Sequence, residues 1–103
     1  MTLIMSGKHV DLTDAIREYA SQKTARLPHF FDRLRNVEVL ADKQDPINFA
    51  VEVIAHADHT SPFVATAVGE DLYACIDKAV DRVERQVRNH KKRHRNRKHI
   101  ARA

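Results

Sequence analysis

Residues 37–67 read VEVLADKQDPINFAVEVIAHADHTSPFVATA, and this stretch contains three runs in which apolar and polar side chains alternate. Alternation is typical of strands that bury one face, because successive side chains of a strand point to opposite sides. The inward positions are Val37, Val39 and Ala41 in the first run, Phe49, Val51, Val53 and Ala55 in the second, and Phe63, Ala65 and Ala67 in the third. Short turns at Asp45-Pro46 and at residues 58–62 separate the runs, so we expect an antiparallel meander.

A short strand and a helix are predicted before this meander. Residues 2–6 alternate in the same way, and we expect Gly7 to end the strand. Thr13 is a good N-cap for a helix, which we expect to end at Pro28. The inward side chains of this helix recur at helical spacing, at Ile16, Tyr19, Ala20, Thr24 and Leu27.

A second helix is predicted after the meander. Gly69 and Asp71 supply a break and a capping carboxylate, and a long stretch without glycine or proline follows. Its apolar residues repeat at steps of three and four, at Leu72, Ile76, Val80, Val83 and Val87. The small residues Ala65 and Ala67 would let a helix lie close against the sheet.

The predicted fold class is α+β with the order β-α-β-β-β-α, in which one four-stranded sheet carries two helices on one face. This order of elements resembles a double-stranded-RNA-binding domain. We expect one domain over residues 1–93 and a basic C-terminal tail over residues 94–103. Phe30 and Phe31 are expected to anchor the rim of the core, and stacking on nucleic-acid bases is the alternative for this pair.

Charge is divided sharply along the chain. Residues 1–84 contain 9 Lys/Arg and 14 Asp/Glu, a net charge of −5, whereas residues 85–103 contain 9 Lys/Arg and no acidic residue, a net charge of +9. A basic end on an acidic body indicates a polyanionic partner, of which nucleic acid is the commonest. The alternative is a tail that only improves solubility.

The last helix is expected to separate packing from charge. At about 100° per residue, Lys78, Arg82, Arg85 and Lys92 fall on one stripe, opposite the apolar positions, with Arg93 close to it. We expect this stripe to point away from the sheet and to stay solvated. The alternative is an ordinary charged face in which pairs such as Asp81–Arg85 neutralise the cations. On the first helix, we expect Lys23 to reach into the groove between the helices.

Motifs of enzymes and metal sites are missing from the sequence. There is no glycine-rich phosphate loop, nucleophile elbow or His-Glu-x-x-His motif, so we expect no enzymatic activity, cofactor or metal. The single Cys75 is expected to be a packing residue. No apolar run approaches the roughly 18 residues that cross a bilayer, and residues 1–10 lack a secretion signal, so a soluble cytoplasmic protein is expected.

One segment is similar to a known family. Residues 69–77 read GEDLYACID, which resembles the G-x-D-(M/L)-Y-A-x-I-D segment of the ribosome hibernation-promoting factor and ribosome-associated translation inhibitor family. The first third agrees as well, at Gly7, Leu12-Thr13, Ile16-Arg17-Glu18-Tyr19, Lys23, Leu27 and Phe31-Asp32-Arg33. The resemblance covers about residues 2–92, in the same order of elements.

The resemblance implies a protein that binds the small ribosomal subunit in the channel for mRNA and tRNA. Bound there, it would exclude tRNA and initiation factors and inhibit translation during stress or stationary phase. The family's rRNA-binding positions correspond here to Lys23, Arg26, Lys78, Arg82, Arg85, Lys91 and Lys92. Charge alone adds Arg88, Arg93 and Arg95 to this set.

The resemblance also implies a short form of the family, because 103 residues leave no space for the dimerising domain of long members. We therefore expect a monomer off the ribosome that cooperates with or opposes a separate ribosome-dimerising factor. Two other hypotheses stay open from the residues alone. One is a general RNA- or DNA-binding module that acts through the basic last helix and tail, and the other is an interaction protein with a solubilising tail.

Overall fold

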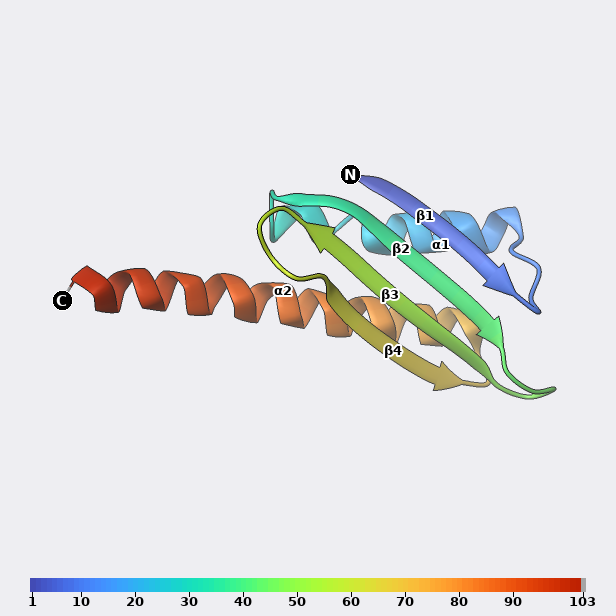
Figure 1. Cartoon of the computed structure of the whole chain (residues 1–103). Coiled ribbons are helices and arrows are strands. Elements are labelled where there is room, and N and C mark those ends of the chain that lie inside the picture. The colour runs from blue at the N-terminus through green and yellow to red at the C-terminus, as the bar shows by residue number, and fades with distance from the viewer. Residues whose placement is uncertain (103) are drawn as a thin grey trace.

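The computed structural model describes the backbone of residues 1–102 and the side chains of residues 1–92. Its elements follow the predicted order (Figure 1). They are β1 (Thr2–Lys8), α1 (Asp14–Thr24), a 3-10 turn (Leu27–His29), β2 (Leu34–Lys43), β3 (Phe49–Ala57), β4 (Phe63–Gly69) and α2 (Leu72–Arg102).

The strands form one sheet in the order β1-β2-β3-β4. β2, β3 and β4 pair antiparallel, which confirms the predicted meander, and β1 adds to β2 in parallel. The register aligns the inward residues in rows across the sheet, for example Met5, Val39, Val53 and Ala65. Side chains that pair across neighbouring strands point to the same face of the sheet. Because the inward residues are aligned in this way, one face of the sheet is continuously apolar.

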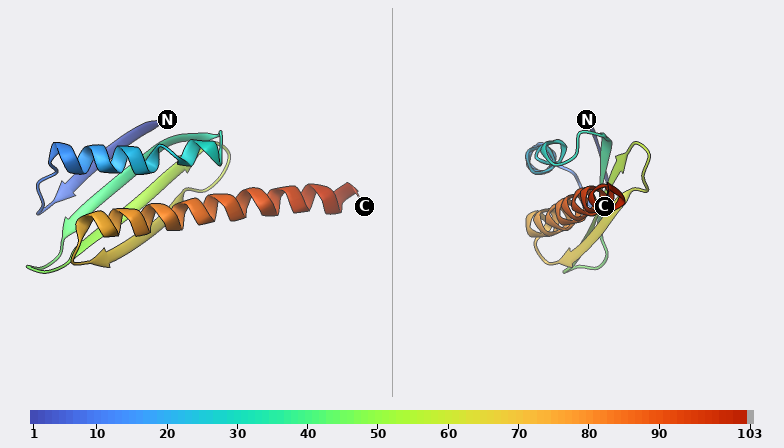
Figure 2. Two further views of the ribbon diagram at one scale, coloured as in Figure 1. Left: turned by 180° about the vertical axis from the view of Figure 1, so that it is seen from behind. Right: turned by 90° about the vertical axis from the view of Figure 1, so that its left-hand side faces the viewer.

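Both helices cover that apolar face, and the opposite face carries no helix (Figure 2). The core between the layers includes Ile16, Ala20 and Leu27 from the first helical segment and Ile76, Ala79, Val80, Val83 and Val87 from α2. Ala65 and Ala67 lie beneath α2 and are buried, as expected for small residues under a closely packed helix. The predicted α+β class with two helices on one face is confirmed.

The helix starts follow the predicted capping. The hydroxyl of Thr13 accepts a hydrogen bond from the backbone N–H of Ile16 at 3.2 Å. The carboxylate of Asp71 accepts one from the N–H of Tyr73 at 3.0 Å and one from the N–H of Ala74 at 3.4 Å. Each cap satisfies backbone donors that have no partner within the first turn.

Two predicted boundaries were wrong. α1 ends at Thr24 rather than at Pro28, and Pro28 instead lies at the start of the 3-10 turn, where its missing N–H is not needed. Gly7 does not end β1, which continues to Lys8. The turn after β1 is made by His9, whose φ is 60°, while a Cβ on Gly7 would lie only 2.8 Å from the carbonyl oxygen of Val10.

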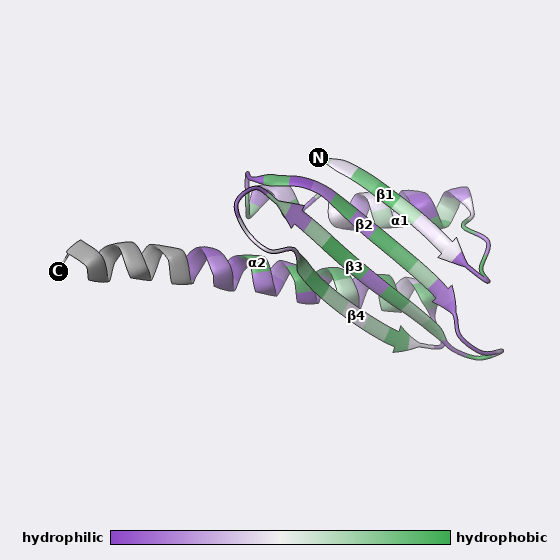
Figure 3. Ribbon diagram, viewed as in Figure 1, coloured by the Kyte–Doolittle hydropathy of each residue, from purple (hydrophilic) through white to green (hydrophobic). Residues whose placement is uncertain are grey.

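The last helix projects beyond the sheet (Figures 1 and 2). α2 runs to Arg102, and its hydropathy changes from mixed over the sheet to hydrophilic towards residue 92 (Figure 3). The expected boundary between a domain at 1–93 and a tail at 94–103 falls inside this helix, and the division stays a prediction. Phe30 and Phe31 pack at the rim of the core, as predicted.

Candidate nucleic-acid interface

The exposed surface of α2 divides into three sides, and its cations lie on all three. We call Lys78, Arg85 and Lys92 the ridge, because they are exposed on the side away from the core. The second side faces β4 and carries Arg82. The third faces α1 and the loop that follows it, and carries Arg88 and Lys91.

The ridge has the solvated cations that the sequence pattern predicts. Among the side chains described, Lys78, Arg85 and Lys92 form no ion pair with any carboxylate. The alternative pair Asp81–Arg85 does not form, and Asp81 instead contacts Arg26, just after α1, at 3.4 Å. The ridge charges are therefore available to an external polyanion.

Arg82 departs from the prediction that the whole stripe points away from the sheet. Its guanidinium donates a hydrogen bond to the backbone carbonyl of Thr66 on β4. Gln86 donates in the same way to the carbonyl of Val64, at 2.8 Å. Four residues of helix rise about 6 Å and two residues of strand about 6.6 Å, so the two side chains match successive carbonyls at the sheet edge. The Arg82 side chain is still exposed, and a guanidinium retains further donors.

The two cations predicted to bind from the first helix contact acidic residues of α2; Lys23 lies in the last turn of α1, and Arg26 lies just after it. The Lys23 ammonium lies 3.2 Å from Asp77, which confirms that Lys23 reaches into the groove between the helices. Arg26 contacts Asp81 at 3.4 Å and Glu84 at 3.3 Å. These cations join the helices and are partly neutralised before any nucleic acid arrives.

Tyr19 strengthens the same junction. Its hydroxyl donates a hydrogen bond to Asp77 at 2.6 Å, and its ring meets that of Tyr73 edge to face, with 5.0 Å between centroids. The hydrogen bond to the Asp77 carboxylate, helped by burial, raises the pKa of Tyr19 to about 12. The phenol therefore stays protonated and keeps donating well above neutral pH.

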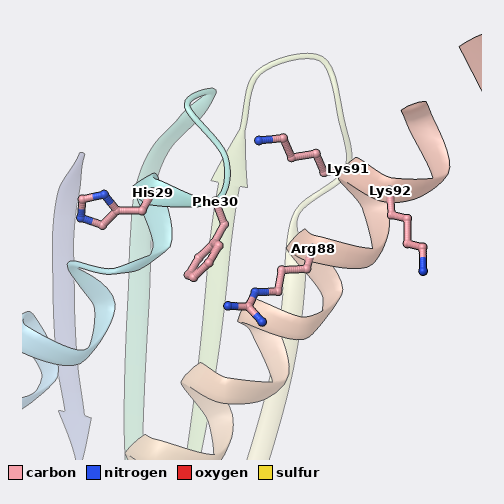
Figure 4. Close-up of a pocket in the computed structure, with 5 residues that line it drawn as sticks. All are labelled: His29, Phe30, Arg88, Lys91 and Lys92. Atoms are coloured by element: carbon pink, nitrogen blue, oxygen red, sulfur yellow. The ribbon is translucent and has the colours of Figure 1, made fainter. Parts of the chain in front are cut away.

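Arg88 lies over an aromatic ring from the loop after α1. Its guanidinium carbon is 4.2 Å from the centre of the Phe30 ring, and Glu84 lies 3.9 Å from its nitrogen, one helical turn earlier. A pocket of about 330 Å³ opens beside this contact (Figure 4). Its lining comprises His29, Phe30, Arg88, Lys91 and Lys92.

The sequence predicted only some of the residues that line this pocket. Arg88, Lys91 and Lys92 were expected as binding residues, but His29 was not, and Phe30 was expected mainly at the core rim. Nothing in the spacing along the chain indicates that residues 29–30 meet residues 88–92, because that meeting depends on how the two helices pack. The side chains of Arg93 and Arg95 lie outside the described residues, and their role stays a prediction.

The remaining described residues were also considered as metal ligands or nucleophiles. The described residues contain no group of three or more His, Cys, Asp or Glu side chains that could hold a metal ion. Cys75 is buried, and burial raises the pKa of its thiol. Within the described chain, neither helix combines the length and hydropathy that a membrane span requires.

Comparison with known proteins places this surface in context. Residues 3–95 match the model of the family described as Sigma 54 modulation protein / S30EA ribosomal protein. The chain belongs to this family. This match and the curated relatives named ribosome hibernation promoting factor together confirm the resemblance drawn from residues 69–77.

Two relatives illustrate the extent of the similarity. The chain is 36% identical over 93 residues to the ribosome hibernation promoting factor of Azotobacter vinelandii, covering 90% of this chain and 85% of that protein. It is 34% identical over 91 residues to the ribosome hibernation promoting factor of Escherichia coli K12, covering 88% of this chain and 94% of that protein.

Two solved structures have the same fold as this chain. The N-terminal domain of Protein Y from Thermus thermophilus is 32% identical and superposes with a TM-score of 0.74, covering 86% of this chain and 94% of that one. A ribosomal subunit interface protein from Coxiella burnetii superposes with a TM-score of 0.81 over 89% of this chain and 99% of that one. At 23% identity, the second likeness supports the fold alone. The likeness to a double-stranded-RNA-binding domain stays a prediction.

Proposed function

We propose that this family member is a ribosome hibernation factor that binds the small ribosomal subunit and silences translation. The observation that carries the proposal is the ridge, where Lys78, Arg85 and Lys92 are exposed and, among the described side chains, unpaired with carboxylates. Cations in this state release condensed counterions from RNA when they bind phosphates, and that release favours association. The similarity to relatives named ribosome hibernation promoting factor supports ribosomal RNA as the partner in this proposal.

The two groups of cations have different roles in this proposal. The ridge and the cations near the end of α2 contact rRNA phosphates directly. Lys23 and Arg26 hold α1 against α2 through Asp77, Asp81 and Glu84, and so keep the surface rigid. A surface that is already ordered loses little conformational entropy on binding.

Inhibition in this proposal is by occlusion. α2 projects beyond the sheet as one extended element (Figure 1). Its described cations are exposed and follow one another from Lys78 to Lys92, which suits a cleft bounded by phosphate backbone. The cleft we propose is the channel for mRNA and tRNA on the small subunit, where the bound protein excludes tRNA and initiation factors. The proposed location is the cytoplasm, on ribosomes, and no catalytic step is part of the proposal.

Sedimentation through sucrose with purified small ribosomal subunits tests the proposal. We expect the protein to co-sediment stoichiometrically with small subunits. Added tRNA should displace it, whereas an equal mass of duplex RNA should not. Equal displacement by any RNA or DNA would support the general nucleic-acid-binding module instead. Absence of co-sedimentation would leave only the interaction protein with a solubilising tail.

A matched pair of charge reversals shows which face binds. Arg85→Glu alters the ridge, and Arg17→Glu makes the same change on α1. Arg17 is two residues before Tyr19, about 200° around the helix from the junction with α2. We expect Arg85→Glu to weaken co-sedimentation and Arg17→Glu to leave it unchanged. Equal losses would mean that net charge, rather than the ridge, determines binding.

A further inference from the structure

The pocket beside Phe30 combines positive charge with flat surfaces, and none of the described residues that line it is acidic. Its volume of about 330 Å³ lies at the lower end of the range for sites that hold a small organic group. We propose that this pocket holds one unpaired nucleotide of an RNA strand, with the base stacked on Arg88 and the adjoining phosphate beside Lys91 and Lys92. The inference rests on the proposed function and adds a base contact to a surface otherwise expected to bind phosphates.

Arg88 is held as a stacking platform before any ligand binds. One side of its guanidinium lies over the Phe30 ring at 4.2 Å, and Glu84 lies 3.9 Å from one of its nitrogens. Phe30 in turn packs against the core, so the platform rests on a fixed base. Because 58% of the Arg88 side chain is exposed, the guanidinium is open to a second planar group. Guanidinium planes stack readily on nucleobases.

The nearby carboxylate does not oppose an anionic ligand strongly. Glu84 is 16% exposed and is also bound by Arg26, at 3.3 Å. Its charge is therefore shared between two guanidinium groups on the side of the pocket towards α1. The net charge that a ligand meets at the pocket is positive.

The two lysines of the pocket, rather than Arg88, are assigned to the phosphate in this proposal. Figure 4 shows Lys91 and Arg88 extending from α2 towards Phe30, while His29 and Lys92 point outward from that centre. An ammonium group on a flexible stem acts as a point charge that can follow a phosphate. A nucleotide thus meets a flat platform at its base and mobile charge at its backbone.

The flat platform selects among polyanions. An acidic peptide would use the cations but would gain nothing from the Phe30–Arg88 pair, since a carboxylate has no extended π face. An RNA duplex presents phosphates but keeps the faces of its bases stacked on one another, out of reach. An unpaired nucleotide is the group that uses both parts of the pocket.

The test compares two single-stranded RNA probes that have the same phosphates. One is a short oligouridylate with a single central adenosine, and the other has an abasic ribose at that position. We expect the protein to bind the adenosine strand at least about 5-fold more tightly, as stacking of one base on a protein side chain provides. Equal affinities for the two strands would overturn the proposal.

Two substitutions at the pocket and one matched control locate the effect. Arg88→Lys keeps the charge and removes the plane, and Phe30→Leu keeps apolar bulk and removes the ring beneath it. We expect both to bring the ratio of affinities close to one. Arg85→Lys makes the same chemical change on the ridge and should leave the ratio unchanged. A ratio that falls equally in Arg85→Lys and Arg88→Lys would contradict the assignment to this pocket.

A competition arm separates an RNA strand from a free nucleotide as the source. Adenosine monophosphate should displace the adenosine strand only weakly, because it lacks the flanking phosphates that the ridge contacts. Displacement by equal concentrations of the mononucleotide would overturn the proposal of an RNA strand. Failure here is distinguishable from failure of the proposed function. Suppose that the wild-type chain co-sediments with small subunits but binds the adenosine and abasic strands equally. That result would refute only this inference and not the proposed function.

Discussion

The guanidinium of Arg82 on α2 donates a hydrogen bond to the backbone carbonyl of Thr66 on β4. This hydrogen bond connects the last helix to the outer strand of the sheet. Arg82 is also one of the residues that the sequence predicts to bind nucleic acid. Arg82 therefore has a structural partner as well as an exposed charge, whereas Arg85 on the ridge is exposed and forms no ion pair with any side chain that the structure describes. The two arginines are nearly adjacent on the helix surface but should respond differently to substitution.

Replacing each arginine by alanine separates these contributions. We expect Arg82→Ala to lower the free energy of unfolding by about 0.5–1 kcal/mol, the range for one hydrogen bond at an exposed site. Arg85→Ala should leave the free energy of unfolding unchanged, and both should weaken binding to small ribosomal subunits. Urea denaturation followed by circular dichroism measures the first quantity. A loss of stability in Arg85→Ala as large as in Arg82→Ala would show that the ridge takes part in packing.

The salt dependence of RNA binding should distinguish free from paired cations. Each phosphate contact contributes about 0.7–0.9 to the slope of log affinity against log salt concentration. We expect Arg85→Ala or Lys78→Ala to reduce the magnitude of the slope by about that amount. Lys23→Ala should reduce it clearly less, because Asp77 lies 3.2 Å from the Lys23 ammonium.

Filter binding of small subunits over a range of salt concentrations gives these slopes. Equal reductions for Lys23 and Arg85 would mean that the pair with Asp77 opens when RNA binds.

The raised pKa of Tyr19 predicts that the folded chain loses stability at high pH. The hydrogen bond to Asp77 raises its pKa from 10.0 to about 12, so the folded chain keeps a proton that the unfolded chain releases near pH 10. The stabilisation is therefore complete below pH 10 and declines as the pH rises towards 12. We expect Tyr19→Phe to unfold more easily than the wild type at neutral pH and to approach it in stability as the pH rises.

Guanidinium denaturation across this pH range measures the difference. Tyr73→Phe is the matched control, since the Tyr73 hydroxyl forms no hydrogen bond with any described side chain or backbone group. A difference between Tyr19→Phe and wild type that does not change with pH would contradict the role of the Asp77 hydrogen bond.

The two glycines should differ in their tolerance of a methyl group. A Cβ at Gly7 would lie 2.8 Å from the carbonyl oxygen of Val10 and 2.9 Å from a side-chain carbon of Leu12, so the turn after β1 must shift. We expect Gly7→Ala to destabilise the fold by about 1–3 kcal/mol. At Gly69 the nearest atom is the sulfur of Cys75 at 3.4 Å, an ordinary contact, and Gly69→Ala should be nearly neutral. Thermal unfolding of the two variants compares them, and equal destabilisation would refute the steric argument.

The sheet could be predicted because its pattern is local. Alternation places Val37, Val39 and Ala41 on one face wherever the neighbouring strands lie, and short turns leave antiparallel pairing as the simplest arrangement. The end of α1 could not be predicted in the same way. Proline is compatible with the first turn of a helical segment, so Pro28 lies inside the 3-10 turn that begins at Leu27 instead of ending α1.

The candidate site was predictable as far as one helix determines it. The helical period identifies which cations of α2 face away from its buried side, and the ridge agrees with that prediction. The pairing of Arg26 with Asp81, 55 residues later, depends on how two helices pack and leaves no mark on local spacing. The contact between Phe30 and Arg88 is of the same kind.

The carbonyls that Arg82 and Gln86 occupy on β4 are those that a strand from another molecule would use to extend the sheet. Unpaired sheet edges are the usual starting points of intermolecular aggregation, and charged side chains placed on them are a common protection. The two long side chains therefore protect this edge of the sheet, and we expect their loss to appear first as turbidity in concentrated samples.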